Sequence, residues 1–241
     1  MSDSIAVFVD AGYLFAQGAT ALSGTTHSRS SLKLDEGAVS AALRKVALDK
    51  GQGCRLLRIY WYDGSSSGQL SADQFALASS DDIKLRLGQI NSVGQQKGVD
   101  SLIVTDLIEL ARNRAISDAL LVSGDEDVRI GVQIAQSFGV RVHLLGIDAT
   151  KKSQSPLLIQ ESDTTSLWQK ADVASFLTIK RQVAISGVAS LIKAAPPATL
   201  EDVAVQWALE LDADQIQSFA EFRKKNNSIP SDLDGKLLAK P

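Results

Sequence analysis

Cysteine and histidine are both scarce in this chain. Its 241 residues include a single cysteine, Cys54, which excludes an internal disulfide framework, and no cysteine–histidine pattern suggests a zinc site. His27 and His143 are the only histidines, so a histidine-based catalytic mechanism is not expected. Any catalysis is therefore expected to depend on carboxylates and a metal ion.

Long hydrophobic runs are also missing. No apolar stretch approaches the roughly 20 residues that span a bilayer. The N-terminus has neither the basic region nor the apolar region of a signal peptide. We therefore expect a cytoplasmic protein with no membrane association. A composition of 44% hydrophobic and 22% charged residues is ordinary for a soluble globular protein.

Positive charge is not in excess either. The formal net charge is −3, so the chain as a whole does not attract the phosphates that provide most nucleic-acid affinity. This balance counts modestly against tight RNA binding. Local basic clusters and a bound divalent metal could offset it, because an enzyme needs only transient contacts with its substrate.

Apolar runs alternate with amphipathic segments over the first 150 residues. This alternation predicts an α/β fold with a doubly wound central parallel sheet covered by helices on both faces. The expected strands cover residues 5–9, 54–62, 118–123 and 140–147, with one more short strand at 157–159. The expected helices cover residues 35–50, 81–93, 102–115, 128–138 and 166–176, while residues 11–21 remain ambiguous.

The character of the chain changes after residue 150. An Ala-Ala-Pro-Pro-Ala segment at 194–198 marks a hinge, and residues 199–223 show helical periodicity. We therefore expect one domain over residues 1–180, followed by a small helical C-terminal appendage over residues 183–241.

Aspartates stand at the ends of several expected strands. Asp10 follows the first strand, and the segment Val-Ser-Gly-Asp-Glu-Asp over residues 122–127 places Asp125 and Asp127 after another. Asp100 begins a helix after a glycine. In parallel sheets ligands bind beyond the carboxyl ends of the strands, and clustered carboxylates raise each other's pKa or demand a cation. The pattern predicts a Mg²⁺ or Mn²⁺ site on these four aspartates.

Plainer interpretations compete with the metal site. An aspartate after a strand can simply cap the next helix, which applies to Asp10, Asp100 and Asp127. Asp106 interrupts an apolar stretch, where a solvated carboxylate would be odd, so a functional role is favoured. It lies about 240° around the helix from Asp100, so the two share a face only if Asp100 is outside the helix proper. Asp63 and Asp148 are weaker candidates.

Several other residues could contact a substrate. Lys97 could face a phosphate, and Ser123 could hydrogen-bond a carboxylate or a phosphate. Arg129 could contact RNA, although each such cation could equally be a solvated surface charge. The same alternatives apply to Arg112, Arg114, Lys151 and Lys152. The aromatic residues 60–62 could stack on bases or pack in the core.

Three segments together resemble a known family. They are Phe-Val-Asp-Ala-Gly-Tyr-Leu at residues 8–14, the segment from Lys97 to Ala111 and the acidic segment at residues 122–127. In order and spacing they resemble the NYN domain of the PIN-like nucleases, and the likeness to bacterial LabA-like members is close. The resemblance covers roughly residues 5–175.

The resemblance implies a doubly wound, Rossmann-like α/β fold, an acidic pocket for Mg²⁺ or Mn²⁺ and endoribonuclease activity on RNA. Carried over by position, Asp10, Asp100, Asp125 and Asp127 match the acidic set that binds metal, and Asp106 matches a helix aspartate. Tyr13 stands where many members have an asparagine, which bears on substrate positioning. The C-terminal segment could mediate formation of a homodimer or the choice of substrate.

Three hypotheses follow. The leading one is a metal-dependent endoribonuclease, in agreement with the absence of an evident Ser–His or Cys–His arrangement. The alternative is a catalytically weak NYN module that binds RNA or protein as a regulator. A Mg²⁺-dependent phosphatase or phosphotransferase of the haloacid dehalogenase class is disfavoured, because Gly12 stands where its second nucleophile-motif aspartate is needed.

Overall fold

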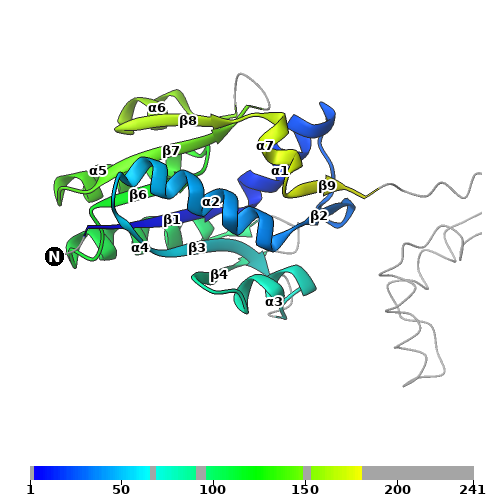
Figure 1. Cartoon of the computed structure of the whole chain (residues 1–241), viewed down its shortest axis with the longest axis horizontal. Helices are drawn as coiled ribbons and strands as arrows, with labels where there is room; N and C mark the ends of the chain where they lie inside the picture. The colour runs from blue at the N-terminus through cyan, green and yellow to red at the C-terminus, as the bar shows by residue number, and fades with distance from the viewer. Residues whose placement is uncertain (1–2, 66–68, 91–95, 149–152, 181–241) are drawn as a thin grey trace, which may run out of the picture. The chain divides into compact units, whose positions relative to one another are not determined.

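The computed structural model describes residues 3–65, 69–90, 96–148 and 153–180 (Figure 1). Within them, seven strands form one sheet in the order β5-β4-β3-β1-β6-β7-β8. Only β5 is antiparallel to its neighbour; the six other strands are parallel. Their bounds are β1 Ser4–Asp10, β3 Arg55–Ser65, β4 Ile83–Ile90, β5 Gln96–Lys97, β6 Asp118–Val122, β7 Arg141–Ile147 and β8 Thr164–Trp168.

The strand order reverses between β1 and β6. From β1 the chain proceeds through β3 to β4 on one side, and from β6 through β7 to β8 on the other. This is the doubly wound arrangement expected from the sequence. In such sheets ligands bind outside the carboxyl ends of the strands at the reversal point. The ends of β1 and β6 are therefore where a functional site is expected.

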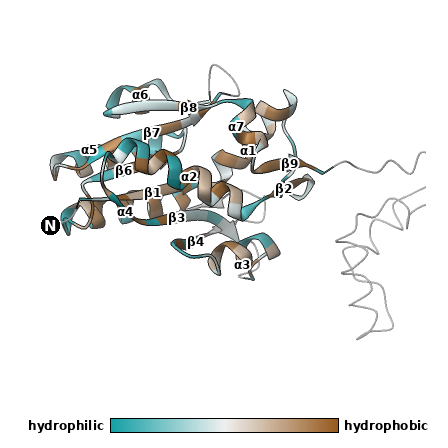
Figure 2. Cartoon of the chain, viewed as in Figure 1, coloured by the Kyte–Doolittle hydropathy of each residue, from teal (hydrophilic) through white to brown (hydrophobic). Residues whose placement is uncertain are grey.

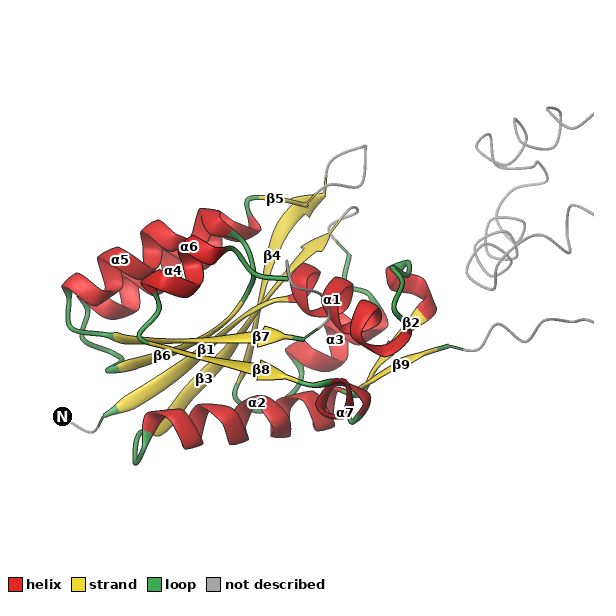
Figure 3. Cartoon of the chain, turned by 90° about the horizontal axis from the view of Figure 1, so that it is seen from above, coloured by secondary structure: helices red, strands yellow, loops and turns green. Residues whose placement is uncertain are grey.

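Helices cover both faces of the sheet (Figure 3). One face packs against α1 (Ala11–Ser23), α2 (Glu36–Gly51) and α7 (Lys170–Ala174). The other packs against α4 (Val99–Arg112), α5 (Arg129–Ser137) and α6 (Pro156–Glu161). A short helix α3 (Ala72–Ala78) connects β3 to β4. Two single-turn helices, η1 (Arg29–Ser31) and η2 (Glu126–Val128), and a small antiparallel pair, β2 (Leu32–Leu34) with β9 (Leu177–Ile179), complete the described part.

The two faces of β1 belong to different cores. Val7 and Val9 pack on the side of α2, whereas Ala6 and Phe8 pack on the side of α4. Both central strands, β1 and β6, are fully buried and largely hydrophobic (Figure 2). Because successive side chains of a strand point to opposite faces, Asp10 lies on the same face as Phe8, towards α4.

The segment 81–93 was predicted to be a helix, but its described part forms strand β4 over Ile83–Ile90 instead. Ile83, Leu85 and Leu87 alternate with Lys84 and Arg86, which is the period of two that a strand requires. The ambiguous segment 11–21 is helix α1. Gly18 is needed there, because a Cβ at that position would lie 2.7 Å from the side chain of Leu177.

Two predictions near the end of the domain are also wrong. Residues 157–159 belong to helix α6 and not to a strand, since Ser155 caps that helix and Pro156 occupies its first position. The strand comes later, as β8 (Thr164–Trp168), and it overlaps the start of the segment 166–176 that was predicted to be helical. Only α7 remains helical there. The appendage predicted over 183–241 lies outside the described residues.

The aromatic residues of β3 belong to the core. Tyr60 is 3% exposed, and Trp61 and Tyr62 are fully buried, so they do not stack on bases. Phe8 stacks on Tyr60 and Tyr62 with ring centroids 5.5 and 6.5 Å apart. Of the helices in the described ranges, none is both long and apolar enough to cross a membrane.

Asp63 is a structural carboxylate, and its removal should destabilise the fold. It is buried and accepts hydrogen bonds from Arg29 Nη2 and Gln74 Nε2, both at 3.0 Å. Asp63→Ala would leave the buried Gln74 amide and the Arg29 guanidinium, whose side chain is 37% exposed, without this acceptor, and each such loss typically costs about 1–3 kcal/mol. We expect Asp63→Ala to lower the free energy of unfolding by about 3 kcal/mol in urea titrations followed by circular dichroism.

The exposed Asp148 provides the control. Asp148→Ala should change the free energy of unfolding by less than about 0.5 kcal/mol. Equal stability of the Asp63→Ala and Asp148→Ala proteins would show that the Arg29–Asp63 contact does not support the fold.

Candidate active site

Asp10 is the innermost carboxylate at the carboxyl end of the sheet. It is the last residue of β1 and the N-cap of α1, and its Oδ1 accepts a hydrogen bond from the Tyr13 backbone N–H at 3.0 Å. The side chain is 8% exposed. Burial raises the pKa of Asp10 to about 6; the Tyr13 N–H opposes this rise, and the charges of Asp100 and Asp125 add to it.

Asp100 and Asp125 approach Asp10 from two other segments. Asp100 lies in the first turn of α4, and burial raises its pKa, with further contributions from the charges of Asp125 and Asp127. Asp125 follows β6, and its Oδ1 accepts a hydrogen bond from the Asp127 N–H at 3.0 Å. The structure thus brings Asp100 and Asp125 near Asp10, and Asp127 near Asp100, from three segments that are far apart along the chain.

Two of the four aspartates are helix N-caps, and two are not. Asp10 caps α1 and Asp125 caps η2. Gly98, not Asp100, is the N-cap of α4, and Val128, not Asp127, is the N-cap of α5. Capping therefore accounts for neither Asp100 nor Asp127. It accounts for the local fold of Asp10, but not for its closeness to two other carboxylates.

The oxygen donors suit a magnesium or manganese ion, which commonly uses one or two carboxylates and several waters. None of the four aspartates forms an ion pair within the described part of the chain. As they lie, no three His, Cys, Asp or Glu side chains of residues 3–65, 69–90, 96–148 and 153–180 are gathered tightly enough to hold an ion. The chemistry of the donor set fits such an ion, with water completing the coordination.

Asp106 is separate from these carboxylates. Because Asp100 lies inside α4, the two residues do not share a helix face. Asp106 Oδ2 instead accepts hydrogen bonds from Tyr62 Oη and Arg86 Nε, both at 3.0 Å. It is not among the charges that shift the pKa of Asp10 or Asp100. Its predicted catalytic role stays a prediction.

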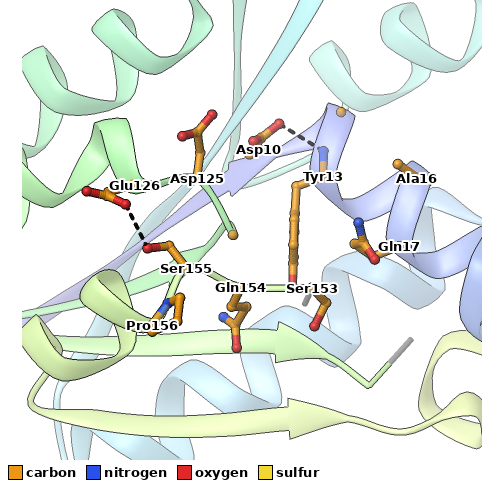
Figure 4. A pocket seen from close by; sticks show the side chains of 12 residues that line it. Asp10, Tyr13, Ala16, Gln17, Asp125, Glu126, Ser153, Gln154, Ser155 and Pro156 are labelled. Carbon is orange, nitrogen blue, oxygen red and sulfur yellow. Dashed lines mark hydrogen bonds between the residues drawn. The ribbon is translucent and has the colours of Figure 1, made fainter. Parts of the chain in front are cut away.

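A pocket of about 740 Å³ adjoins Asp10 and Asp125 (Figure 4). Tyr13 lines it, and the Tyr13 hydroxyl accepts a hydrogen bond from the Ile147 N–H at 3.1 Å. A Cβ on Gly124 would collide with the Tyr13 ring and with the Ser153 carbonyl oxygen. The remaining lining comes from Gly12, Ala16, Gln17, Glu126, Gln154, Ser155 and Pro156.

Sequence reasoning missed most of this lining. Gln17 could have been found, since it lies one helical turn after Tyr13 on the same face of α1. Residues 153–156 carried no such signal, because tertiary hydrogen bonds fix them. Ser155 N–H donates to the Gly124 carbonyl at 2.9 Å, and Gln154 Nε2 donates to the Ser123 carbonyl at 3.1 Å.

Of the predicted substrate contacts whose side chains the structure describes, only Tyr13 lines the pocket. Ser123 is fully buried, and its hydroxyl accepts a hydrogen bond from the Asp125 N–H at 3.2 Å, so it shapes the acidic loop. Arg129 lies at the start of α5, 3.9 Å from Glu161. The backbone of Lys97 belongs to β5, but its side chain lies outside the described part of the structure, as do Lys151 and Lys152.

The raised pKa of Asp10 predicts a pH-dependent stability in metal-free buffer. The pKa is about 6 in the folded protein against the usual 3.8, so the folded state binds the proton more tightly. The associated stability is complete below about pH 4 and is lost as the pH rises through 6. Asp10→Asn cannot ionise and keeps an oxygen for the Tyr13 N–H. We expect it to be more stable than the wild type by roughly 2–3 kcal/mol above pH 6.

Urea unfolding in EDTA from pH 4 to pH 7 measures this difference. A gap between the variant and the wild type that stays constant over this range would contradict the raised pKa.

Comparison with known proteins agrees with this geometry. The family model of the NYN domain matches residues 4–167. The uncharacterized protein y4oD of Sinorhizobium fredii (strain NBRC 101917 / NGR234) is 56% identical over 182 residues, which cover 70% of this chain and 85% of that protein. With the doubly wound sheet and the convergent aspartates, these matches show that the chain belongs to the NYN domain family of the PIN-like nuclease superfamily.

Proposed function

We propose that this protein is a metal-dependent endoribonuclease that hydrolyses RNA phosphodiester bonds with Mg²⁺ or Mn²⁺. The observation that carries the proposal is the convergence of Asp10, Asp100 and Asp125 from three separate segments at the reversal point of the sheet. Neighbouring carboxylates disfavour each other's ionisation, and a bound cation would relieve that repulsion. Membership of a nuclease superfamily supports hydrolysis as the reaction.

The residues of the site have distinct parts in this proposal. Asp10 is fixed by β1 and by the Tyr13 N–H, so its oxygens are held rigidly. Asp100 and Asp125 supply the facing oxygens, and the exposed Asp127 beside them can orient a water molecule. A divalent cation bound there would polarise the scissile phosphate and neutralise charge as the phosphodiester is cleaved.

The pocket beside the carboxylates suits one nucleotide of the substrate. It opens next to Asp10 and Asp125, and most of its polar lining is uncharged, including Gln17, Ser153 and Ser155. Neutral amides and hydroxyls can hydrogen-bond to a base or a ribose without repelling the phosphates. RNA placed in this way would present a phosphodiester to the aspartates.

Cleavage of labelled RNA tests the proposal. We expect single-stranded and structured RNA to be cut in Mn²⁺ or Mg²⁺ but not in EDTA. Asp10→Asn and Asp125→Asn should reduce the rate by at least about 100-fold, because each removes a charge needed for the cation. Asp148→Asn changes an exposed strand-end aspartate outside the cluster and should cleave at the wild-type rate.

Intact RNA in every reaction, with the protein folded, would contradict the nuclease assignment. If the same RNA were bound in EDTA without being consumed, the alternative of a catalytically weak regulatory module would take its place.

Metal binding should also be visible without any substrate. A ligand that binds only the folded state stabilises it by about 2.7 kcal/mol at 100 times its dissociation constant. Each kcal/mol raises the melting temperature of a protein of this size by roughly 2–4 °C. Saturating Mn²⁺ should therefore raise the melting temperature of the wild type by at least about 5 °C.

Asp10→Asn should show little of this Mn²⁺ response, and Asp148→Asn should show all of it. Equal responses of the two variants in differential scanning fluorimetry would remove Asp10 from the set of metal ligands.

A further inference from the structure

Three basic side chains gather on the α4 side of β3 and β4. Arg58 lies on β3 and Arg86 lies on β4. Their guanidinium carbons are 5.7 and 5.6 Å from the centre of the Tyr60 ring. Lys84 is exposed and is the register partner of Tyr60. Neither Arg58 nor Lys84 forms an ion pair with any described residue. This basic surface was not predicted from the sequence, because β4 was expected to be a helix.

The register of the sheet places Arg86 in line with Asp10. Asp10 pairs with Tyr62 on β3, and Tyr62 pairs with Arg86 on β4. Neighbouring strands are about 4.8 Å apart, so the backbones of Asp10 and Arg86 are separated by about 10 Å. All three side chains point to the same face, so the Arg86 side chain stands beside the candidate active site.

Asp106 fixes the orientation of the Arg86 guanidinium group. The carboxylate accepts a hydrogen bond from Arg86 Nε at 3.0 Å and a second from the Tyr62 hydroxyl. The arginine side chain remains 41% exposed, and its Nη groups have no hydrogen-bond partner among the described residues. A guanidinium held by Nε keeps its Nη donors in the geometry that recognises a phosphate.

We propose that Arg86, oriented by Asp106 and flanked by Arg58 and Lys84, binds a phosphate of single-stranded RNA next to the bond that is cleaved. This inference rests on the proposed ribonuclease function. The acidic cluster repels the RNA backbone, and a net charge of −3 provides no general attraction, so binding needs local positive charge beside the cluster. Arg86 is then a substrate-positioning residue, and Asp106 supports it instead of ligating the metal.

Fluorescence anisotropy with a 5′-labelled single-stranded RNA in EDTA tests the subsite without any cleavage. Arg86→Gln can still donate a hydrogen bond to Asp106 but loses the charge. We expect its dissociation constant at about 100 mM NaCl to rise about five- to tenfold. The slope of log affinity against log salt should fall by about 0.7, which corresponds to one phosphate contact fewer on a single strand.

Lys84→Gln changes an exposed residue. It should also reduce the slope of log affinity against log salt. Arg141→Gln is the matched control, because Arg141 is exposed at the opposite, amino-terminal end of β7. Its affinity should stay within twofold of the wild type. The circular dichroism melting temperature of each variant confirms that it is folded.

Asp106→Ala tests whether Asp106 orients the Arg86 guanidinium or only neutralises its charge. Removing a negative charge near the RNA would tighten binding if Asp106 only neutralised Arg86. We expect weaker binding, by about threefold, because the guanidinium loses its fixed geometry. In Mn²⁺ the variant should raise KM with kcat near the wild-type value and should keep the Mn²⁺-induced rise in melting temperature. Tighter binding, or loss of the metal response, would overturn the role given to Asp106.

The outcomes also distinguish the two proposals. A wild-type protein that binds and cleaves RNA, with Arg86→Gln indistinguishable from Arg141→Gln, would overturn the phosphate subsite alone. A wild-type protein that neither binds nor cleaves RNA would overturn the ribonuclease function, and the subsite with it.

Discussion

Electrostatic repulsion at the end of β1 is the constraint on which this site depends. Asp10 is almost completely buried at the point where the strand order reverses, and Asp100 and Asp125 add negative charge from two other segments. Burying a carboxylate is costly, and neighbouring carboxylates raise the cost. The backbone hydrogen bond from Tyr13 compensates only part of it. A cation bound at that edge of the sheet, as proposed above, would offset the rest of this cost.

The acidic site at the ends of β1 and β6 could be predicted from the sequence because short sequence segments indicate it. An apolar strand that ends in Asp10, and the Ser-Gly-Asp-Glu-Asp segment after β6, are visible in the printed chain. Strand–helix alternation placed both at the carboxyl end of a parallel sheet, and the structure agrees. Segment 81–93 was assigned incorrectly because its apolar residues were compared with the wrong period. That error concealed the alternation of Lys84 and Arg86 with the buried residues of β4.

The pocket could not be derived in the same way. Its far wall is formed by residues 153–156, where Ser155 and Pro156 mark only the start of α6, and hydrogen bonds to the loop after β6 hold this wall in place. Tyr13 reaches across to the backbone of β7, so its hydroxyl is engaged and its ring forms a wall of the pocket. Gly124 leaves room for that ring. These three features depend on one another in space, and none indicates the others along the chain.

Charge is distributed unevenly over the α4 face of the sheet, and this distribution would give the two parts of the site different roles. The edge at β1 and β6 is acidic and suits a cation, whereas β3 and β4 carry arginine and lysine. Asp106 accepts hydrogen bonds from Arg86 and Tyr62 and belongs to the basic part. An anionic polymer would be repelled by the first surface and attracted by the second. Phosphate contacts fix the register of a nucleic acid without reading its bases. Under the proposed ribonuclease function, the basic strands would hold the chain of phosphates while a cation bound by the aspartates would act on one of them.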